Sequence, residues 1–584
     1  MSDKLTALRA ELAKLKVDAF LVPRTDEYQN EYVPACAERL AWLTGFTGSA
    51  GTAIVLADQA ALFVDGRYTL QAPAEVDTQL FTIHHSGTTP PADWLFNTLP
   101  DGAQVGFDPW LHPQSWVETN AKKLASRRIA LVPLNYNPID RCWADRPPAP
   151  RAPFVVQPAE FAGESAQSKR LRIAQLLKDS GTDAFVLTAP DSIAWLLNIR
   201  GHDVPHTPLP LCFAILHAAG TVDLFVDAAK ITDDVRAHLG NAVQLEAPEK
   251  LGQAINTLSR TCVLAADSNA SAAWIFAAAA DDNIRRQTDP CLLPKARKNA
   301  AELAGTRAAH LRDGAAMVRL LSTIKAGDDE LGVTERLYLA RTQGEHFRDL
   351  SFDTIAGSGP NGAIVHYRSS EKTNRHLQDG ELFLLDSGAQ YVDGTTDITR
   401  TIAIGTPTPE MKDRFTRVLK GHIAIATALF PKGTTGHQLD AFARHALWQI
   451  GADFDHGTGH GVGSYLSVHE GPQRISPRPS PLGVLEEGMI LSNEPGYYKS
   501  GAYGIRIENL IVVQKATLPG AEREMLGFET ITLCPIDRNL IEVSLLSADE
   551  RSWLNAYHAR VLAALAPQLD ATNQHWLATA CAPL

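Results

Sequence analysis

The spacing of hydrophobic and polar positions changes several times along the chain, and these changes predict helices that alternate with short strands. Leu5, Leu8, Leu12 and Leu15 recur at helical spacing, which predicts an amphipathic helix near the N-terminus. Short apolar runs that fit buried strands follow between further helical patterns, as is typical of α/β units. A long helical pattern spans residues 300–325. The chain is therefore expected to belong to the α/β (α+β) class.

The first 290 residues contain a degenerate repeat. Three pairs of short segments match in the same order, namely 18–22 with 183–187, 40–43 with 193–196, and 62–65 with 224–227. Chance could give one such match, but three in one order predict two duplicated domains. Only the first copy continues into Gly66-Arg67. An exposed Arg67 could bind a carboxylate bidentately, and its other interpretation is a surface ion pair.

Two proline-containing stretches mark domain boundaries. Residues 146–153 include four prolines, which break helices and strands and indicate a linker. A second boundary lies between Asp289 and Pro294. A chain of 584 residues is long enough for three domains, which we expect at residues 1–150, 151–294 and 295–584.

Charge and cysteine content exclude several classes of protein. Lys plus Arg number 54 against 66 Asp plus Glu, a net charge of −12, and such a chain is a poor general nucleic-acid binder. The seven cysteines form no C-x-x-C motif, which argues against a disulfide framework or a thiolate zinc site. The N-terminal segment lacks a signal-peptide core, and no stretch approaches the ~20 apolar residues that cross a bilayer. We expect a cytoplasmic protein with no membrane or nucleic-acid partner.

The region after residue 380 concentrates acidic residues at the ends of predicted strands. A strand over residues 381–386 ends in Asp386, a turn is expected at Asp393-Gly394, and Asp397 begins the next strand. Two carboxylates 11 positions apart therefore come together on adjacent strands. They need partners, because burying an unpaired charge costs several kcal/mol.

Two more acids and a histidine cluster follow. His456, His460 and His469 lie within 14 residues, next to a glycine-rich run that lets the backbone approach a site closely. Glu494 ends an apolar strand. Glu508 lies in a strand expected over residues 504–513, where alternation places Arg506 on the same face and in reach of its carboxylate.

Two Asp, two Glu and one neutral His carry a charge of −4, which two divalent cations balance. Oxygen ligands with one imidazole and no thiolate suit Mn, Fe, Co or Zn, and such a pair of cations activates water for hydrolysis. Four separately salt-bridged carboxylates are the other interpretation, but it must explain why all four lie on glycine-flanked strands. The sequence contains no G-x-S-x-G, H-E-x-x-H or P-loop motif.

The order and local strings of these residues resemble the pita-bread metallopeptidases, which include methionine aminopeptidase, prolidase and aminopeptidase P. The strings that most resemble the long, three-domain cytosolic aminopeptidase P are 386–391, 393–401, 456–463 and 493–498. The resemblance covers essentially the whole chain. It implies two duplicated creatinase-like N-terminal α/β domains, followed by a pita-bread catalytic domain with a C-terminal extension.

The resemblance also implies a role for each acid. Asp397 and Glu508 would bridge the two metal ions. Asp386 would complete one shell, and His460 and Glu494 the other, with Glu494 as general base. Mn²⁺ is the metal that the family implies, and Zn²⁺ or Co²⁺ fits the same ligands.

Substrate contacts are implied in the same way. His366 and His469 would bind substrate and stabilise the tetrahedral intermediate, which makes them catalytic together with Glu494. His456 and Tyr498 would line a pocket for the proline ring. The full set of implied substrate-binding residues is Arg67, His366, His456, His469, Tyr498 and Arg506. Arg67 matches an arginine that reaches the substrate across the subunit boundary of a homodimer.

The function implied is removal of an N-terminal residue that precedes proline in a peptide, by a hydroxide bound between two metal ions. A prolidase-type dipeptidase shares the metal site and is the alternative, although prolidases usually carry one N-terminal domain. A non-catalytic peptide-binding relative would have lost ligands, and all five stand here.

Overall fold

The computed structural model describes residues 2–584, which divide into two compact units. The N-terminal unit holds the chain up to Ala159 and from Glu164 to Leu292. The C-terminal unit holds Glu160–Gly163 and Leu293–Leu584. Within residues 2–584, no helix is both long and apolar enough to cross a membrane.

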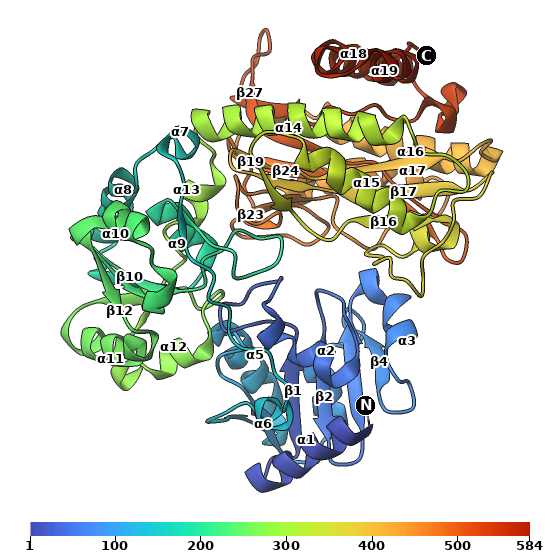
Figure 1. Ribbon diagram of the computed structural model, residues 1–584. Coiled ribbons are helices and arrows are strands. Elements are labelled where there is room, and N and C mark those ends of the chain that lie inside the picture. The colour runs from blue at the N-terminus through green and yellow to red at the C-terminus, as the bar shows by residue number, and fades with distance from the viewer. Residues whose placement is uncertain (1) are drawn as a thin grey trace. The chain divides into compact units, whose positions relative to one another are not determined.

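The N-terminal unit contains two six-stranded sheets with the same topology (Figure 1). The first has the order β4-β3-β2-β1-β5-β6 and the second β12-β11-β10-β8-β13-β14, and equivalent neighbours pair in the same direction. The first sheet's strands are β1 (Ala19–Pro23), β2 (Thr52–Leu56), β3 (Ala60–Val64), β4 (Thr82–His85), β5 (Gln104–Phe107) and β6 (Ala130–Pro133). The second sheet's are β8 (Ala184–Leu187), β10 (Phe213–His217), β11 (Val222–Phe225), β12 (Val243–Glu246), β13 (Leu264–Ala266) and β14 (Arg285–Arg286). The predicted duplication is confirmed.

Helices cover these sheets, and two short strands pair apart from them. The helices of the first copy are α1 (Ser2–Leu15), α2 (Arg39–Thr44), α3 (Gln71–Glu75), α4 (Pro91–Thr98), α5 (Gln114–Leu124) and α6 (Pro138–Cys142). Later come α8 (Ala166–Asp179), α9 (Pro190–Leu197), α10 (Asp233–Leu239), α11 (Leu251–Thr261) and α12 (Ala273–Ala277), with β7 (Val155–Val156) paired to β9 (Ile199–Arg200). The helix α1 buries Leu5, Leu8 and Leu12, as the periodicity predicts.

The two copies meet through equivalent segments. Pro113 and Ala272, which are 159 positions apart, form an antiparallel bridge. On either side, the backbone N–H of Gln114 donates to Ser271 O and that of Ala273 to His112 O. The offset of 159 positions that relates Pro113 to Ala272 also converts one of these bonds into the other, so the contact has the form of an isologous interface within one chain.

Aromatic rings fill this intramolecular interface, and the structure predicts that they are energetically coupled. The Trp110 and Trp274 rings stack with centroids 4.0 Å apart and planes at 17°. Such pairs contribute about 0.5–1.5 kcal/mol beyond the area that they bury. We expect a double-mutant cycle of Trp110→Ala and Trp274→Ala, measured by urea unfolding, to give a coupling energy of about 1 kcal/mol. A coupling energy near zero would contradict this assignment.

The C-terminal unit is built from four sheets. Their orders are β15-β18-β19, β16-β17-β20, β21-β28-β27-β24-β22-β23 and β25-β26. The first eight strands are β15 (Phe347–Leu350), β16 (Ile355–Ser358), β17 (Leu382–Ser387), β18 (Ala389–Tyr391), β19 (Gly394–Thr395), β20 (Ile398–Ala403), β21 (Phe430–Pro431) and β22 (Gly459–Gly461). The others are β23 (Glu470–Ile475), β24 (Ile490–Asn493), β25 (Gly496–Lys499), β26 (Tyr503–Arg506), β27 (Asn509–Ala516) and β28 (Met525–Thr530).

Helices pack around these sheets, and the last two come from the end of the chain. They are α7 (Ala159–Ala162), α13 (Leu292–Ala296), α14 (Ala300–Leu321), α15 (Glu330–Thr342), α16 (Pro409–Ala426), α17 (Gly436–Trp448), α18 (Ala548–Leu565) and α19 (Ala571–Ala580). Figure 1 shows α18 and α19 together, and both contact α14. Val418 of α16, Ile505 of β26 and Val561 of α18 share one buried core. The C-terminal helices are therefore part of the core of this unit.

Two predicted elements of this unit can be compared with the structure. The long helix begins at Ala300, where Asn299 and Glu302 form a capping box, and it ends at Leu321, four residues before the predicted end. The single strand predicted over residues 504–513 is wrong. It divides into β26 and β27, because β26 pairs with β25 whereas β27 pairs with β24 and β28. Ile507 and Glu508 lie in the break.

The buried His558 of α18 makes folding stability depend on pH. Its Nε2 accepts a hydrogen bond from the Ile536 backbone N–H at 3.1 Å, and burial lowers its pKa from 6.5 to about 4. As the pH falls, His558 is therefore protonated in the unfolded chain before it is protonated in the folded protein. The stabilisation is complete above pH 6.5 and is lost toward pH 4, by roughly 1.4 kcal/mol per pH unit.

We expect His558→Gln, which keeps an acceptor for Ile536, to flatten the acid limb of the stability profile by this amount. Urea unfolding between pH 6.5 and 4 measures the effect. His575→Gln, at an exposed position of α19, is the matched control and should follow the wild type. Equal slopes for all three proteins would show that His558 is not the source.

Candidate metal centre

A pair of antiparallel strands brings the two aspartates together. Asp386 near the end of β17 pairs with Thr399 of β20, and Ser387 pairs with Ile398. Asp397 directly precedes β20. Between them β18 and β19 form the predicted hairpin, with Tyr391 opposite Gly394. The adjacency of the two carboxylates thus follows from the local hairpin.

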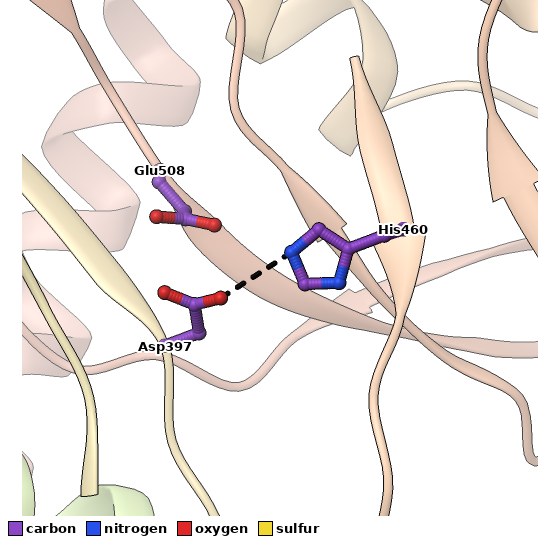
Figure 2. A group of neighbouring side chains, drawn as sticks. All are labelled: Asp397, His460 and Glu508. Atoms are coloured by element: carbon purple, nitrogen blue, oxygen red, sulfur yellow. Dashed lines mark ion pairs between the residues drawn. The ribbon is translucent and has the colours of Figure 1, made fainter. Parts of the chain in front are cut away.

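Two other segments bring a histidine and a glutamate to the same place. One ligand atom from each of Asp397, His460 and Glu508 lies within 4.8 Å of the other two. Figure 2 shows the two carboxylates facing each other, with the imidazole turned toward them. His460 comes from β22, and Glu508 from the break between β26 and β27. The chain's switch from one sheet to another places Glu508 here.

The hydrogen bonds of His460 define which ring nitrogen is free. Its Nδ1 lies 3.0 Å from the carbonyl oxygen of Gly461, which can only accept, so Nδ1 carries the proton. Nε2 lies 3.3 Å from Asp397 Oδ2 and 3.8 Å from Glu494 Oε1. The Nε2 lone pair therefore faces the carboxylates, which is the orientation of a metal-ligating histidine.

Burial and mutual repulsion strongly perturb the carboxyl groups. Burial, together with the charges of Asp386 and Glu494, raises the pKa of Asp397 well above its usual range. Burial and the charge of Asp397 do the same for the pKa of Glu508. The pKa of Glu494 rises to about 8, chiefly through burial and then through Glu508. Without a cation, these acids cannot all ionise together.

Neighbouring side chains donate hydrogen bonds to the carboxylates of the cluster and hold them in place. Thr399 Oγ1 donates to Glu508 Oε2 at 2.7 Å, and Arg506 Nη2 donates to Asp386 Oδ2 at 2.6 Å. Ser492 Oγ donates to Glu494 Oε1 at 3.3 Å and accepts from the His460 backbone N–H. Asp386 Oδ1 is buried and accepts no hydrogen bond from residues 2–584.

This donor set fits divalent cations. Three buried carboxylates, the half-buried Glu494 and an imidazole nitrogen with its lone pair directed inward offer oxygen and nitrogen ligands, and Asp386 Oδ1 is unused. None of the ligands is a thiolate, which suits Mn²⁺, Zn²⁺ or Co²⁺. Positive charge at this place would relieve the repulsion that raises the pKa values of Asp397, Glu494 and Glu508.

Family models match almost the whole length of this chain. Residues 4–142 and 145–302 each match a creatinase/prolidase N-terminal domain. Residues 304–515 match metallopeptidase family M24, and residues 524–584 match the C-terminal region of peptidase M24. An aminopeptidase P2 of Arabidopsis thaliana is 40% identical over 630 aligned positions, covering 100% of this chain and 89% of that protein.

This chain belongs to the aminopeptidase P group of metallopeptidase family M24. A probable Xaa-Pro aminopeptidase P of Laccaria bicolor is also 40% identical, covering 100% of this chain and 94% of that protein. The crystal structure of an X-prolyl aminopeptidase from Caenorhabditis elegans, described as a cytosolic enzyme with a di-nuclear active site, superposes with a TM-score of 0.96 at 35% identity. It covers 100% of this chain and 99% of that one. The chain is an enzyme, and the predicted fold of two creatinase-like domains and a pita-bread domain is confirmed.

Three further residues predicted for this M24 site lie beside the cluster. The rings of His460 and His469 lie 4.3 Å apart at 75°. His456 Nδ1 donates to Gly457 O, so its Nε2 accepts the Tyr498 hydroxyl proton at 2.8 Å. Tyr498 in turn accepts from Arg506 Nη1 at 2.6 Å. A continuous chain of hydrogen bonds thus links His456 to Asp386 through Tyr498 and Arg506.

The other two predicted residues are His366 and Arg67. His366 is half-buried in the turn after the 3₁₀ helix Gly359–Ala363, which packs against β26. Arg67 lies in the N-terminal unit, where its Nε and Nη2 bind Asp65 at 2.9 and 2.7 Å. This is the ion pair that the sequence offered as the other interpretation of Arg67. The substrate roles of both residues stay predictions.

The sequence reasoning missed the neutral donors of the site. Thr399 lies two residues after Asp397, and Ser492 lies two residues before Glu494. Side chains two positions apart on a strand lie on the same face. The spacing of two from a candidate ligand was therefore the sequence signal that could have identified Thr399 and Ser492. Arg400 points to the opposite face and binds the backbone of Glu508 from behind.

Proposed function

We propose that this chain is an Xaa-Pro aminopeptidase that hydrolyses the bond between an N-terminal residue and a penultimate proline. The observation that carries the proposal is the approach of Asp397, Glu508 and the lone-pair nitrogen of His460 within 4.8 Å. The names of the full-length relatives support the substrate class.

Five side chains would hold a pair of divalent cations, with Mn²⁺ proposed as the native metal and Zn²⁺ or Co²⁺ as alternatives. They are Asp386, Asp397, His460, Glu494 and Glu508. When bound, the cations supply Lewis-acid polarisation of the scissile carbonyl and acidify a water molecule at neutral pH. The protein's share is to present the oxygens and the imidazole nitrogen already oriented, since Thr399, Ser492 and Gly461 fix three of them.

Proton transfer is assigned to Glu494, which would accept a proton from the attacking water and pass it to the departing proline nitrogen. Its Oε1 is held 3.3 Å from Ser492 Oγ, at the end of β24. His366 and His469 are proposed to bind the substrate and to stabilise the tetrahedral intermediate. An X-Pro bond is a tertiary amide with no N–H, so the site needs no acceptor at that nitrogen.

Proline recognition is assigned to His456 and Tyr498, with Arg506 fixing the Tyr498 hydroxyl. We also propose a cytoplasmic homodimer, in which Arg67 reaches the substrate held by the other subunit. Domain boundaries at residues 150 and 294 belong to the same proposal.

A prolidase-type dipeptidase activity is the alternative. The Xaa-Pro dipeptidase of Bacillus anthracis is 26% identical with a TM-score of 0.53, and it covers 64% of this chain but 99% of its own. The relatives that match the whole chain at 40% identity are named aminopeptidase P, and this favours the aminopeptidase.

One experiment tests the function and separates the two activities. The purified protein is analysed for metal, stripped and reconstituted with Mn²⁺, and then offered Arg-Pro-Pro and Ala-Pro. We expect about two metal ions per chain and hydrolysis of the tripeptide. Cleavage of Ala-Pro alone would favour the dipeptidase, and reconstituted protein that cleaves neither would overturn the proposal.

A further inference from the structure

A buried arginine lies directly behind the metal centre, and its surroundings are unusual. Arg400 of β20 is 2% exposed, and none of the carboxylates within residues 2–584 lies within 4.0 Å of its guanidinium nitrogens. A buried cation without a carboxylate must be stabilised by dipoles. The five N–H groups of Arg400 instead lie within hydrogen-bond distance of six neutral acceptors, namely Thr399 O, Glu508 O, Asn509 Oδ1, Cys534 O, Pro535 O and the Tyr557 hydroxyl.

These acceptors belong to two parts of the chain, the candidate metal centre and the C-terminal region. Glu508 O at 2.6 Å and Thr399 O at 2.8 Å belong to the backbone of the candidate metal centre. Cys534 O at 2.8 Å, Pro535 O at 2.9 Å and the Tyr557 hydroxyl at 3.0 Å belong to the C-terminal region, residues 524–584. Arg400 therefore ties the carbonyl of a proposed metal ligand to a segment more than 20 residues downstream.

The network continues to the second glutamate. Asn509 Oδ1 accepts from Arg400 and lies 3.3 Å from the Tyr557 hydroxyl, and Asn509 Nδ2 donates to His422 Nε2 at 3.1 Å. His422 Nδ1 donates to Asn493 O, and Asn493 Nδ2 donates back to His422 O. Asn493 and Asn509 are paired in the sheet, and each adjoins one glutamate of the centre, Glu494 and Glu508.

We propose that the C-terminal region is part of the metal centre: Tyr557 and the carbonyls of Cys534 and Pro535, acting through Arg400 and Asn509, fix the backbone positions of Glu508 and Glu494 and thereby set metal affinity. Tyr557 and Arg400 are positioning residues, since neither touches the ligand oxygens. Helix α18 suits this role, because Trp553 stacks on Tyr557 with centroids 5.4 Å apart and also contacts the His422 ring. This inference rests on the proposed function.

The test is Mn²⁺ binding to the apoprotein, measured by calorimetry. Tyr557→Phe removes the hydroxyl that lies 3.0 Å from Arg400 Nη2 and keeps the aromatic ring that stacks on Trp553. Partners beyond the ligands typically tune metal affinity by 10- to 100-fold, so we expect its dissociation constant to rise about tenfold. Arg400→Lys keeps the charge but not the planar fork, and it should weaken binding further. Tyr68→Phe is the matched control, since this buried hydroxyl of the N-terminal unit binds Ser49 instead.

Kinetics distinguish positioning from a general loss of structure. For Tyr557→Phe we expect kcat to fall at low Mn²⁺ and to recover at saturating Mn²⁺, with KM for Arg-Pro-Pro unchanged. Wild-type affinity in both Tyr557→Phe and Arg400→Lys would overturn this inference and leave the proposed function standing. A wild-type apoprotein that takes up no Mn²⁺, Zn²⁺ or Co²⁺ would overturn both.

Discussion

Replacing Glu494 by alanine is expected to lower kcat by roughly 10³-fold or more, because the substitution removes the proposed general base and one proposed metal ligand together. General acid–base catalysis alone accounts for about 10²–10⁴-fold in rate. The Glu494 carboxylate lies 3.8 Å from His460 Nε2 and accepts a hydrogen bond from Ser492, so it is held within the cluster. Steady-state hydrolysis of Arg-Pro-Pro at saturating Mn²⁺ measures the effect.

A second substitution at Glu494 distinguishes the loss of the general base from the loss of the metal ligand. Glu494→Gln keeps the shape and one neutral oxygen, so we expect it to retain more metal than Glu494→Ala while remaining nearly as slow. Glu487→Ala is the matched control, because Glu487 is exposed and lies in the same segment, where it pairs loosely with Lys515 at 3.7 Å. Wild-type kcat in Glu494→Ala would contradict the role assigned to this residue.

Strand alternation and hairpin turns made much of the centre predictable. Asp386 and Asp397 come together because they flank one hairpin. The turn of this hairpin could be predicted because turn residues are recognisable in the local sequence. Glu494 follows an apolar strand, as expected. The neutral donors Thr399 and Ser492 obey the same period of two, but hydroxyl side chains are too common on strands to be selected without a structure.

The break before Glu508 could not be predicted, and its cause is tertiary. The pattern of residues 504–513 fits one continuous strand, since Ile505 and Ile507 alternate with polar positions and residues 510–513 are all apolar. Both halves are strands in the structure. They separate only because β25 pairs with the first half and β24 with the second, and partners in a sheet are not encoded in the local pattern. The same break turns Glu508 toward Asp397.

Hydrogen-bond networks between residues far apart in the chain could not be predicted from the sequence either. Arg400 binds carbonyl groups about 135 residues away, and Arg341 pairs bidentately with Asp313 while it donates to Gly388 O beside the Asp386 strand. Such partners depend on packing of the whole unit. The roles of His366, His469 and Arg67 come from family resemblance and stay predictions, as do the boundaries between domains.

A buried charge cluster beside the centre allows the second large prediction. Glu470 begins β23 directly after His469, and its backbone packs against Gly461, where a side chain would not fit. Its carboxylate is fully buried between two lysines, with Lys295 Nζ 2.9 Å from Oε2 and Lys298 Nζ on Oε1. Both lysine side chains are 1% exposed. The cluster therefore fixes the start of β23 to the segment that precedes α14.

Glu470→Gln is expected to lower the free energy of unfolding by about 3–5 kcal/mol, because it leaves two buried ammonium groups without this counter-charge. Lys298→Met should cost less, since the Lys295–Glu470 pair persists. Urea unfolding provides the measurement, and Glu529→Gln is the control. Glu529 pairs with Arg307 at 2.6 Å on the surface, where such a pair contributes about 0–1 kcal/mol. If Glu470→Gln unfolded at the same urea concentration as Glu529→Gln, the buried cluster would not be a source of stability.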